Sequence, residues 1–181
     1  MAKETLEVRK KIVFKGHVIA IREDTISYND GTESVRQILQ APQGVLILPV
    51  TDEGNIILTK EYRHNHGKIF GVPMGKMDPG EKPIESAKRE LQEELGITAN
   101  IWTHISTHHN GVHEEGLNHY FLAEKLSHGV ATPEDDEEID LVEMTFKNAF
   151  LLMNQENGGF VDLRTRGCIW ASYIYMMERS K

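Results

Sequence analysis

Residues 75–97, GKMDPGEKPIESAKRELQEELGI, constrain the fold more than any other part of the sequence. Proline suits the first turn of a helix and glycine suits a left-handed C-cap, so Pro83 and Gly96 predict a helix from about Pro83 to Leu95. Four apolar residues share one stripe of that helix: Ile84, Ala87, Leu91 and Leu95. The chain must therefore supply a buried surface for this stripe.

Three glutamates crowd a neighbouring stripe of the same helix. Glu90 and Glu94 are four residues apart, and Glu93 is three residues after Glu90. Like charges at this spacing destabilise an isolated helix by roughly 0.2–0.5 kcal/mol per pair, and a hard divalent cation would reverse that effect. Mg²⁺ binds through one or two carboxylates while it keeps waters and takes up phosphate oxygens. The stripe predicts a metal platform for phosphate chemistry, with a solvated acidic helix face as the alternative.

Composition limits the class of protein. The chain has 181 residues, which suits one buried domain with a small accessory element. No apolar run approaches the roughly 18 residues that span a bilayer, and a formal net charge of −8 argues against a nucleic-acid partner. The single cysteine, Cys168, fits a reducing compartment and a buried apolar position. We expect a cytoplasmic protein with no nucleic-acid or membrane partner.

The first half of the chain predicts strands. Residues 1 to about 40 form strand-like runs with a hairpin at Asn29-Asp30-Gly31, a set too small to be stable alone. Pro42 and Gly44 mark a boundary between segments 1–42 and 43–181. The apolar run GVLILPV predicts a strand covered on both faces. The turn at residues 52–55 predicts a second hairpin, with NIILTKEYR as its return strand.

The second half predicts an alternation of strands and helices. ITANIWTHIS and LNHYFLAEKL are expected as strands around a loop at residues 107–116, followed by an acidic loop at 132–140. Two helices close the chain, at about residues 147–155 and 162–178, and the last carries a core stripe of Ile169, Tyr173, Met176 and Met177. The element order predicts an α/β protein with a mixed sheet sandwiched by helices.

Residues 75–97 match the pattern G-x5-E-x7-R-E-U-x-E-E-x-G-U at every fixed position, where U is aliphatic. This stretch resembles the Nudix box of the Nudix hydrolases. SVRQIL, GVLILPV, KEYR, VPMGKMDPGE and DDEEI resemble the branch that hydrolyses ADP-ribose and nucleoside diphosphate sugars. The resemblance implies an α/β/α Nudix sandwich in residues 43–181. It also implies a small N-terminal β segment, residues 1–42, that is exchanged between the subunits of a homodimer.

The resemblance assigns roles to individual residues. It makes Glu90, Glu93 and Glu94 metal ligands, joined by the backbone carbonyl of Met74. The catalytic set comprises Glu93 and Arg89, and Arg89 orients a glutamate. It also includes two residues of the acidic loop: Glu137, which binds metal or activates water, and its neighbour Asp135. The substrate contacts are Arg36, which acts across the dimer, Arg63, Tyr62, His109 and Gly111. Arginine suits this role because its planar fork binds phosphate through two hydrogen bonds.

The implied reaction is hydrolysis of a pyrophosphate bond, with Mg²⁺, or alternatively Mn²⁺, as cofactor. Bound Mg²⁺ would neutralise developing charge and lower the pKa of a water, and Glu137 or Asp135 would take its proton. The products would be a nucleoside monophosphate and a sugar phosphate.

Other interpretations stay open. Gly71 stands where many ADP-ribose enzymes carry Glu, and His109-Asn110-Gly111 where they carry Ser-Pro-Gly, so a nucleoside diphosphate sugar is at least as good a candidate substrate. A triphosphate or dinucleotide hydrolase would keep the metal site, although compact triphosphate enzymes commonly lack the N-terminal strands. A catalytically silent nucleotide sensor is a third hypothesis, against which stand the complete box carboxylates.

Five histidines between residues 104 and 119 invite a zinc interpretation, because His109 and His113 have the i, i+4 spacing of a helical site. The intervening Asn110-Gly111 disfavours a helix. A polar or pocket-lining loop is the preferred interpretation.

Overall fold

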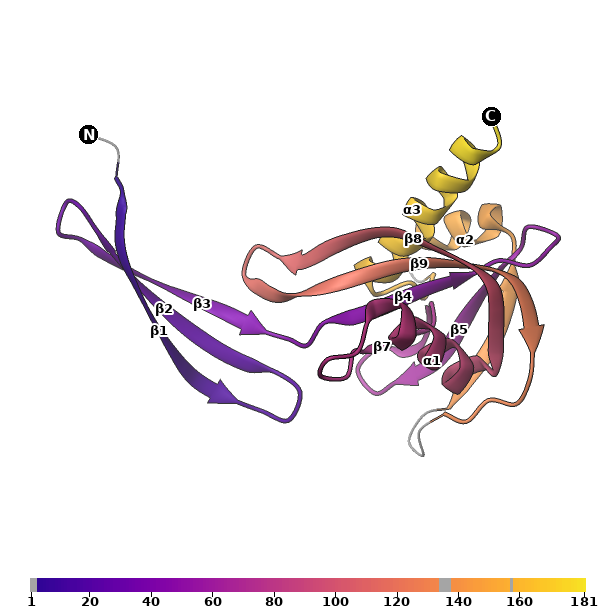
Figure 1. Ribbon diagram of the computed structural model, residues 1–181, viewed down its shortest axis with the longest axis horizontal. Coiled ribbons are helices and arrows are strands. Elements are labelled where there is room, and N and C mark those ends of the chain that lie inside the picture. The colour runs from indigo at the N-terminus through magenta and orange to yellow at the C-terminus, as the bar shows by residue number, and fades with distance from the viewer. Residues whose placement is uncertain (1–2, 134–137, 157) are drawn as a thin grey trace. The chain divides into compact units, whose positions relative to one another are not determined.

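The computed structural model of the chain describes residues 3–133, 138–156 and 158–181 (Figure 1). Its contacts divide the chain into two compact units. The first unit combines Met1–Gln43 with His108–Leu117, and the second combines Gly44–Thr107 with Asn118–Lys181. Among the described residues, no helix is long and apolar enough to cross a membrane.

The first unit is built on an antiparallel meander of β1 (Thr5–Lys15), β2 (Ala20–Tyr28) and β3 (Glu33–Gln40). The predicted β2–β3 hairpin is confirmed, since Ser27 pairs with Glu33 and Gly31 adopts the positive φ of 81° that the turn needs. Every residue of β1 is exposed. The segment from 108 to 117 adds the turn between two later strands, which pairs with the end of β3.

In the part of the chain that the structure describes, the strands of the second unit belong to two sheets. They are β4 (Gly44–Pro49), β5 (Ile56–Arg63), β6 (Gly67–Gly71), β7 (Met74–Lys76), β10 (Ile139–Met144) and the parts of β8 (Ile97–Gly111) and β9 (Glu114–His128) that lie outside residues 108–117. β4 lies between antiparallel β7 and parallel β9, and β8 pairs with β9. β5 is the centre of the other sheet, between β10 and β6. The predicted mixed sheet is therefore present.

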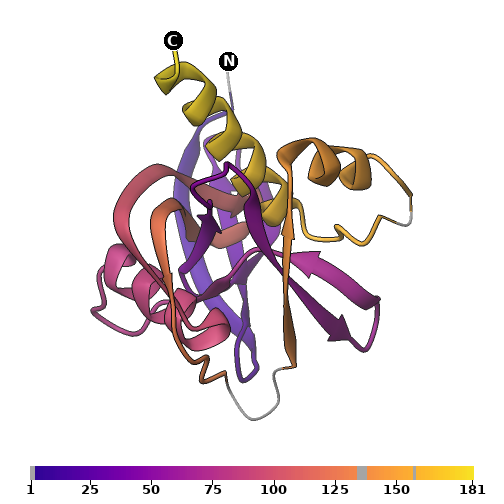
Figure 2. The same ribbon diagram turned by 90° about the vertical axis from the view of Figure 1, so that its right-hand side faces the viewer.

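Among the described residues, three helices cover these strands: α1 (Pro83–Leu95), α2 (Phe146–Met153) and α3 (Leu163–Arg179). Strand β4 is buried on both faces, as predicted. Val45 and Ile47 point into a core shared with α1, whereas Leu46 and Leu48 point into a core shared with α2 and α3. Figure 2 shows α1 and the α2–α3 pair on different sides of the strands. This is the predicted α/β/α sandwich.

The predicted bounds of α1 are confirmed. Pro83 stands at its first turn, and Gly96 ends it in the left-handed conformation, at φ 64°. The apolar stripe packs as expected, because Ala87, Leu91 and Leu95 are buried and Ile84 packs against the same cluster. Local sequence signals were sufficient here.

Two predicted connections differ from the structure. The turn between β4 and β5 forms, with the Thr51 amide donating to the Asn55 carbonyl at 2.8 Å and an antiparallel bridge between Val50 and Ile56, but beyond this bridge the two strands enter different sheets. A strand that is apolar on both faces needs a neighbour on each edge, and β4 finds these in β7 and β9. The loop expected at residues 107–116 is mostly strand, because β8 continues to Gly111 and β9 begins at Glu114.

The core stripe predicted for the last helix is partly wrong. Ile169 and Met176 contribute to the core, but Met177 is 50% exposed, and Tyr173 packs against the rings of α2. Cys168 is fully buried, as predicted, and burial raises the pKa of its thiol to about 12.

A candidate metal and phosphate site at the carboxylate helix

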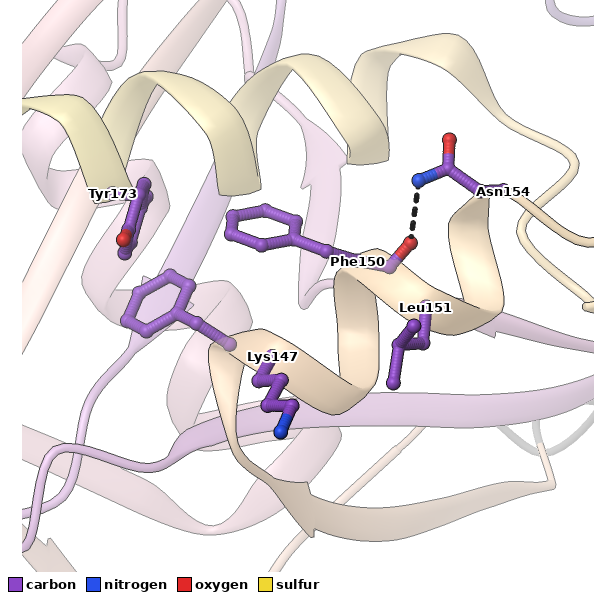
Figure 3. Close-up of a pocket in the computed structure, with 6 residues that line it drawn as sticks. Lys147, Phe150, Leu151, Asn154 and Tyr173 are labelled. Atoms are coloured by element: carbon purple, nitrogen blue, oxygen red, sulfur yellow. Dashed lines mark hydrogen bonds between the residues drawn. The ribbon is translucent and has the colours of Figure 1, made fainter.

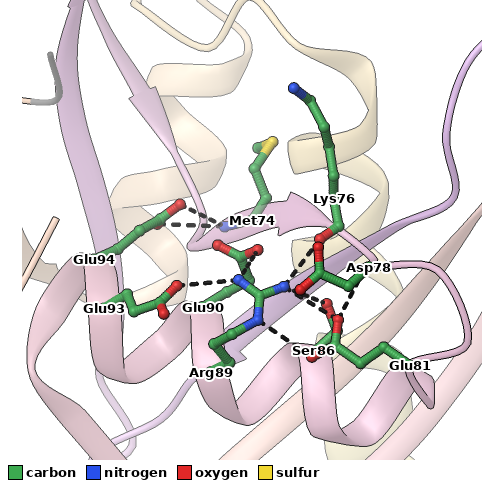
Figure 4. Close-up of polar contacts among 9 residues, drawn as sticks. All are labelled: Met74, Lys76, Asp78, Glu81, Ser86, Arg89, Glu90, Glu93 and Glu94. Atoms are coloured by element: carbon green, nitrogen blue, oxygen red, sulfur yellow. Dashed lines mark hydrogen bonds and ion pairs between the residues drawn. The ribbon is translucent and has the colours of Figure 1, made fainter. Parts of the chain in front are cut away.

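Two glutamates of α1 are held against the backbone of β7 (Figure 4). Both carboxylate oxygens of Glu94 accept from the Met74 amide at 3.3 Å. Glu90 lies over Gly75, where an added Cβ atom would stand 1.9 Å from the Glu90 Cδ atom. The absence of a side chain at Gly75 therefore leaves the space that the Glu90 carboxylate fills. Glu90 and Glu94 are 9% and 8% exposed.

Arg89 is the centre of a hydrogen-bond network on the next face of α1 (Figure 4). Its guanidinium donates to Glu81 at 3.1 and 3.2 Å, to Glu90 at 2.8 Å and to Glu93 at 3.0 Å. It also donates to the Lys76 carbonyl at 3.0 Å, which fixes it to the strand. The guanidinium of Arg89 lowers the pKa of Glu81 to about 2, and these carboxylates raise the pKa of Arg89.

The donor set fits a hard divalent cation. Three carboxylates, those of Glu81, Glu90 and Glu93, contact a single guanidinium, and a fourth, that of Glu94, lies on the Met74 amide of the adjacent strand. The carboxylates outnumber the guanidinium in a partly buried place. All the donors are oxygens, the ligand type that Mg²⁺ prefers. Within residues 3–133, 138–156 and 158–181, no group of three or more acidic, histidine or cysteine side chains is arranged so that it could hold a metal ion by itself. Waters or phosphate oxygens would have to complete the shell, as is usual for Mg²⁺.

The structure brings together five of the predicted site residues, all on α1 or β7: Met74, Arg89, Glu90, Glu93 and Glu94. Arg63 and Tyr62 lie in the same unit, at the end of β5. Tyr62 is 65% exposed, and Arg63 forms an ion pair with Glu61 at 2.8 Å.

Of the other predicted residues, three belong to the first unit and two lie outside the described residues. Arg36, His109 and Gly111 are exposed residues of the first unit, and Arg36 donates to the Val35 carbonyl at 3.0 Å. Asp135 and Glu137 lie outside the described residues. Their assigned roles stay predictions.

Sequence reasoning missed two contributors. Ser86, fully buried on α1, accepts from Arg89 at 3.3 Å, and its i, i+3 spacing to Arg89 was the available signal. The Lys76 carbonyl left no signal, because a backbone acceptor can be identified only from the fold.

Four of the clustered histidines, His104, His108, His109 and His119, lie on strands, and His113 lies in the turn between β8 and β9. His104 and His119 share the hydroxyl of Thr107, at 3.0 and 2.9 Å. Burial, followed by the charge of His104, lowers the pKa of His119. As expected, no helix forms there.

A separate cavity of about 340 Å³ lies between α2 and α3 (Figure 3). It is lined by Phe146, Lys147, Phe150, Leu151, Asn154 and Tyr173. None of the carboxylates of α1 lines it, so it is distinct from the candidate site.

Comparison with known proteins agrees with this geometry. The chain is 36% identical to the ADP-ribose pyrophosphatase of Bacillus subtilis (strain 168) over 180 residues, which cover 97% of this chain and 95% of that protein. It is 28% identical to the methanol dehydrogenase activator of Bacillus methanolicus, over 98% of this chain and 96% of that protein. A crystal structure of an ADP compounds hydrolase shares the fold, with a TM-score of 0.83 at 20% identity over 99% of this chain and 96% of that one. The NUDIX domain model matches residues 41–163, and with the box helix and its carboxylates in place, the chain belongs to the Nudix family.

Proposed function

We propose that this chain hydrolyses the pyrophosphate bond of ADP-ribose or of a nucleoside diphosphate sugar, giving a nucleoside monophosphate and a sugar phosphate. The observation that carries the proposal is the seating of Glu90 and Glu94 on β7 beside Arg89 and Glu93. The near full-length similarity to an ADP-ribose pyrophosphatase supports the substrate class. Gly71 and His109-Asn110-Gly111 depart from the residues that many ADP-ribose enzymes carry. For this reason, nucleoside diphosphate sugars stay candidate substrates together with ADP-ribose.

Nudix hydrolases generally use a divalent metal ion. Here we propose Mg²⁺, with Mn²⁺ as the alternative, held by Glu90, Glu93 and Glu94 and by the Met74 carbonyl. When bound, the metal would neutralise phosphate charge and lower the pKa of a water. Arg89 holds Glu90 and Glu93 in one orientation through hydrogen bonds of 2.8 and 3.0 Å.

The remaining roles rest on sequence. Glu137 or Asp135 would accept the proton of the attacking water, and Arg63 and Tyr62 would contact the substrate. Arg63 suits a phosphate because its guanidinium is more than half exposed and its ion-pair partner is on its own strand.

The experiment is product analysis after incubation with Mg²⁺ and a panel of ADP-ribose, ADP-glucose, UDP-glucose, GDP-mannose, a dinucleotide and a triphosphate. The expected result is a monophosphate and a sugar phosphate from the sugar nucleotides. Glu94→Gln should abolish most of this activity, whereas Glu85→Gln, an exposed residue on the same helix, should not. Near wild-type turnover of Glu94→Gln at saturating Mg²⁺ would refute the role of Glu94 as a metal ligand. Products from the triphosphate or dinucleotide alone would show that the chain hydrolyses that class of substrate and not sugar nucleotides.

We also propose a homodimer in which residues 1–42 are exchanged onto the catalytic domain, residues 43–181. Apolar side chains of β1 support it, because Leu6, Ile12 and Phe14 are 71%, 48% and 51% exposed. A small strand set with such a surface needs a partner to be stable. Light scattering should give the mass of two chains for the wild type and of one chain for Phe14→Glu. The cytoplasmic location stays a prediction from the composition.

A further inference from the structure

The first unit contains a buried cation that the proposed chemistry does not use. Arg22, on β2, is 8% exposed. Its Nε and Nη2 atoms donate to the two carboxylate oxygens of Asp24 at 2.6 and 2.8 Å, and its Nη1 atom donates to Glu115 at the start of β9. Gln40, at the end of β3, donates to the same Glu115 oxygen at 2.9 Å. Arg22 and Glu115 are 93 residues apart in the sequence.

This cluster is a poor way to gain stability alone. A buried guanidinium loses its hydration, and replacing a buried ion pair by apolar side chains is often neutral or stabilising. The hydrogen bonds of Arg22 lower the pKa values of Asp24 and Glu115, which keeps both carboxylates ionised at neutral pH. What such a cluster does supply is one preferred arrangement of the elements that carry it.

The arrangement at stake is a short strand pairing. The segment from residue 108 to 117, here called the tip, comprises the end of β8, the turn at residues 112–113 and the start of β9. It pairs in parallel with β3 at only two positions, Leu39 with Glu114 and Gln40 with Glu115. The backbone bonds that hold it include one from the Leu39 amide to the His113 carbonyl at 2.8 Å and one from the Ala41 amide to the Glu115 carbonyl at 3.0 Å.

A pairing of two positions defines its own register weakly, and the longer pairing of β9 with β4 begins only at Asn118. A slip of one residue would turn every side chain of the paired stretch to the opposite face. Only the observed register places the Glu115 carboxylate where it accepts from both Arg22 and Gln40. Gly116 permits the close approach, because a Cβ atom there would lie 3.1 Å from the Ala41 carbonyl oxygen and φ is 137°.

We propose that Arg22 is a positioning residue that sets the register of the tip through Glu115, and thereby the placement of His109 and Gly111 for substrate binding. The inference rests on the proposed function, because these two residues are its predicted substrate contacts. The claim that Arg22 sets the register of the tip depends only on contacts within the first unit. Arg22 itself touches no substrate.

The kinetic test compares Arg22→Gln, Glu115→Gln and the double variant with Arg9→Gln. Arg9 is the matched control, since it is an exposed arginine of the same sheet, paired with Glu33 at 2.8 Å. We expect KM for the best sugar nucleotide to rise roughly tenfold in both single variants, with kcat within about twofold of wild type. The double variant should be no worse than either single one, because the two residues act as one pair. Arg9→Gln should match the wild type.

The second readout is amide hydrogen exchange at Leu39 and Ala41, the two donors to the tip. Exchange should quicken in Arg22→Gln and Glu115→Gln and stay unchanged in Arg9→Gln. Glu115→Gln keeps the test available if Arg22→Gln does not fold, because the Glu115 side chain is 46% exposed. Wild-type exchange and KM in Glu115→Gln would overturn the proposal.

The two readouts separate failure of this inference from failure of the proposed function. Faster exchange with unchanged KM would overturn the link to substrate binding, and a fall in kcat alone would do the same. A wild type that hydrolyses no member of the panel would defeat the proposed function and the kinetic part together. Exchange at Leu39 and Ala41 would then still decide whether Arg22 sets the register.

Discussion

Substituting Gly75 by alanine should disable the candidate site through Glu90. The new Cβ atom would stand 1.9 Å from the Glu90 Cδ atom, where ordinary contact needs 3.4 Å, so the carboxyl must move by about 1.5 Å. Mg²⁺ demands ligand oxygens at about 2.0–2.1 Å in near-octahedral geometry and cannot follow such a shift. Glu90 would also lose its 2.8 Å hydrogen bond from Arg89.

Two magnitudes follow for Gly75→Ala. The cost in unfolding free energy should lie at the low end of the about 1–3 kcal/mol that overpacking carries, because the atoms met by the new Cβ are the far end of the flexible Glu90 side chain. Displacing a metal ligand should lower kcat/KM by about 100-fold, at the upper end of what outer-shell changes cost. Urea unfolding measures the first quantity, and hydrolysis of a sugar nucleotide over a range of Mg²⁺ concentrations measures the second.

Two further variants make the result specific to Glu90. Gly44→Ala, on the neighbouring strand, would bring a Cβ atom to 3.1 Å from the Gly75 carbonyl oxygen, a tight backbone contact that does not involve the Glu90 carboxylate, and it should leave the Mg²⁺ requirement unchanged. The double variant Gly75→Ala/Glu90→Ala should recover stability, because the clash is gone, but not activity. If Gly75→Ala alone kept kcat/KM within threefold of wild type with an unchanged Mg²⁺ requirement, Glu90 would not be the ligand described here.

Three other predictions concern charge and burial. The pKa of Glu81 is lowered to about 2 from 4.5, so its contribution to stability is complete above pH 4.5 and is lost as the pH falls toward 2. This shift corresponds to at most about 3 kcal/mol of unfolding free energy, and to about 1–2 kcal/mol after screening. Glu81→Gln should therefore flatten the loss of stability at acid pH in urea titrations. Arg89→Met should lower kcat by roughly 10- to 100-fold. Arg89→Lys should be intermediate, since a lysine keeps the charge but not the planar guanidinium that donates to two carboxylates. Steady-state kinetics equal to wild type in Arg89→Met would contradict this. Cys168 should resist iodoacetamide at pH 8 in the native protein, because it is buried and burial raises the pKa of its thiol to about 12. It should react once urea unfolds the protein, as followed by mass spectrometry. Prompt modification under native conditions would show that the core around Cys168 opens.

Sequence predicted most about α1, because its signals are local. Pro83 and Gly96 fix its ends, and the spacing of Glu90, Glu93 and Glu94 places three carboxylates on one stripe. The same local logic failed at the turn between β4 and β5. Turn residues predict that the chain reverses, but they do not determine which strand pairs with which, and here the neighbours come from distant parts of the chain.

The parts of the site that sequence could not supply are those made by long-range contacts. The space at Gly75 that the Glu90 carboxylate fills depends on how β7 lies against α1. The ion pair between Arg22 and Glu115 depends on the contact of β2 with the tip. Each of these residues looks ordinary in the sequence, where Gly75 is a pattern position and Arg22 a strand residue. Their roles follow from tertiary placement rather than from spacing.

The position of β4 also has a consequence for synthesis of the chain. Its parallel partner β9 begins its pairing with Asn118 against Gly44, 74 residues later in the chain. At roughly 5–20 residues per second, the ribosome delivers that partner about 4–15 s after the strand has been made. During that interval one edge of a continuous apolar strand has no partner, so this is the stage at which chaperone binding or aggregation would compete with folding.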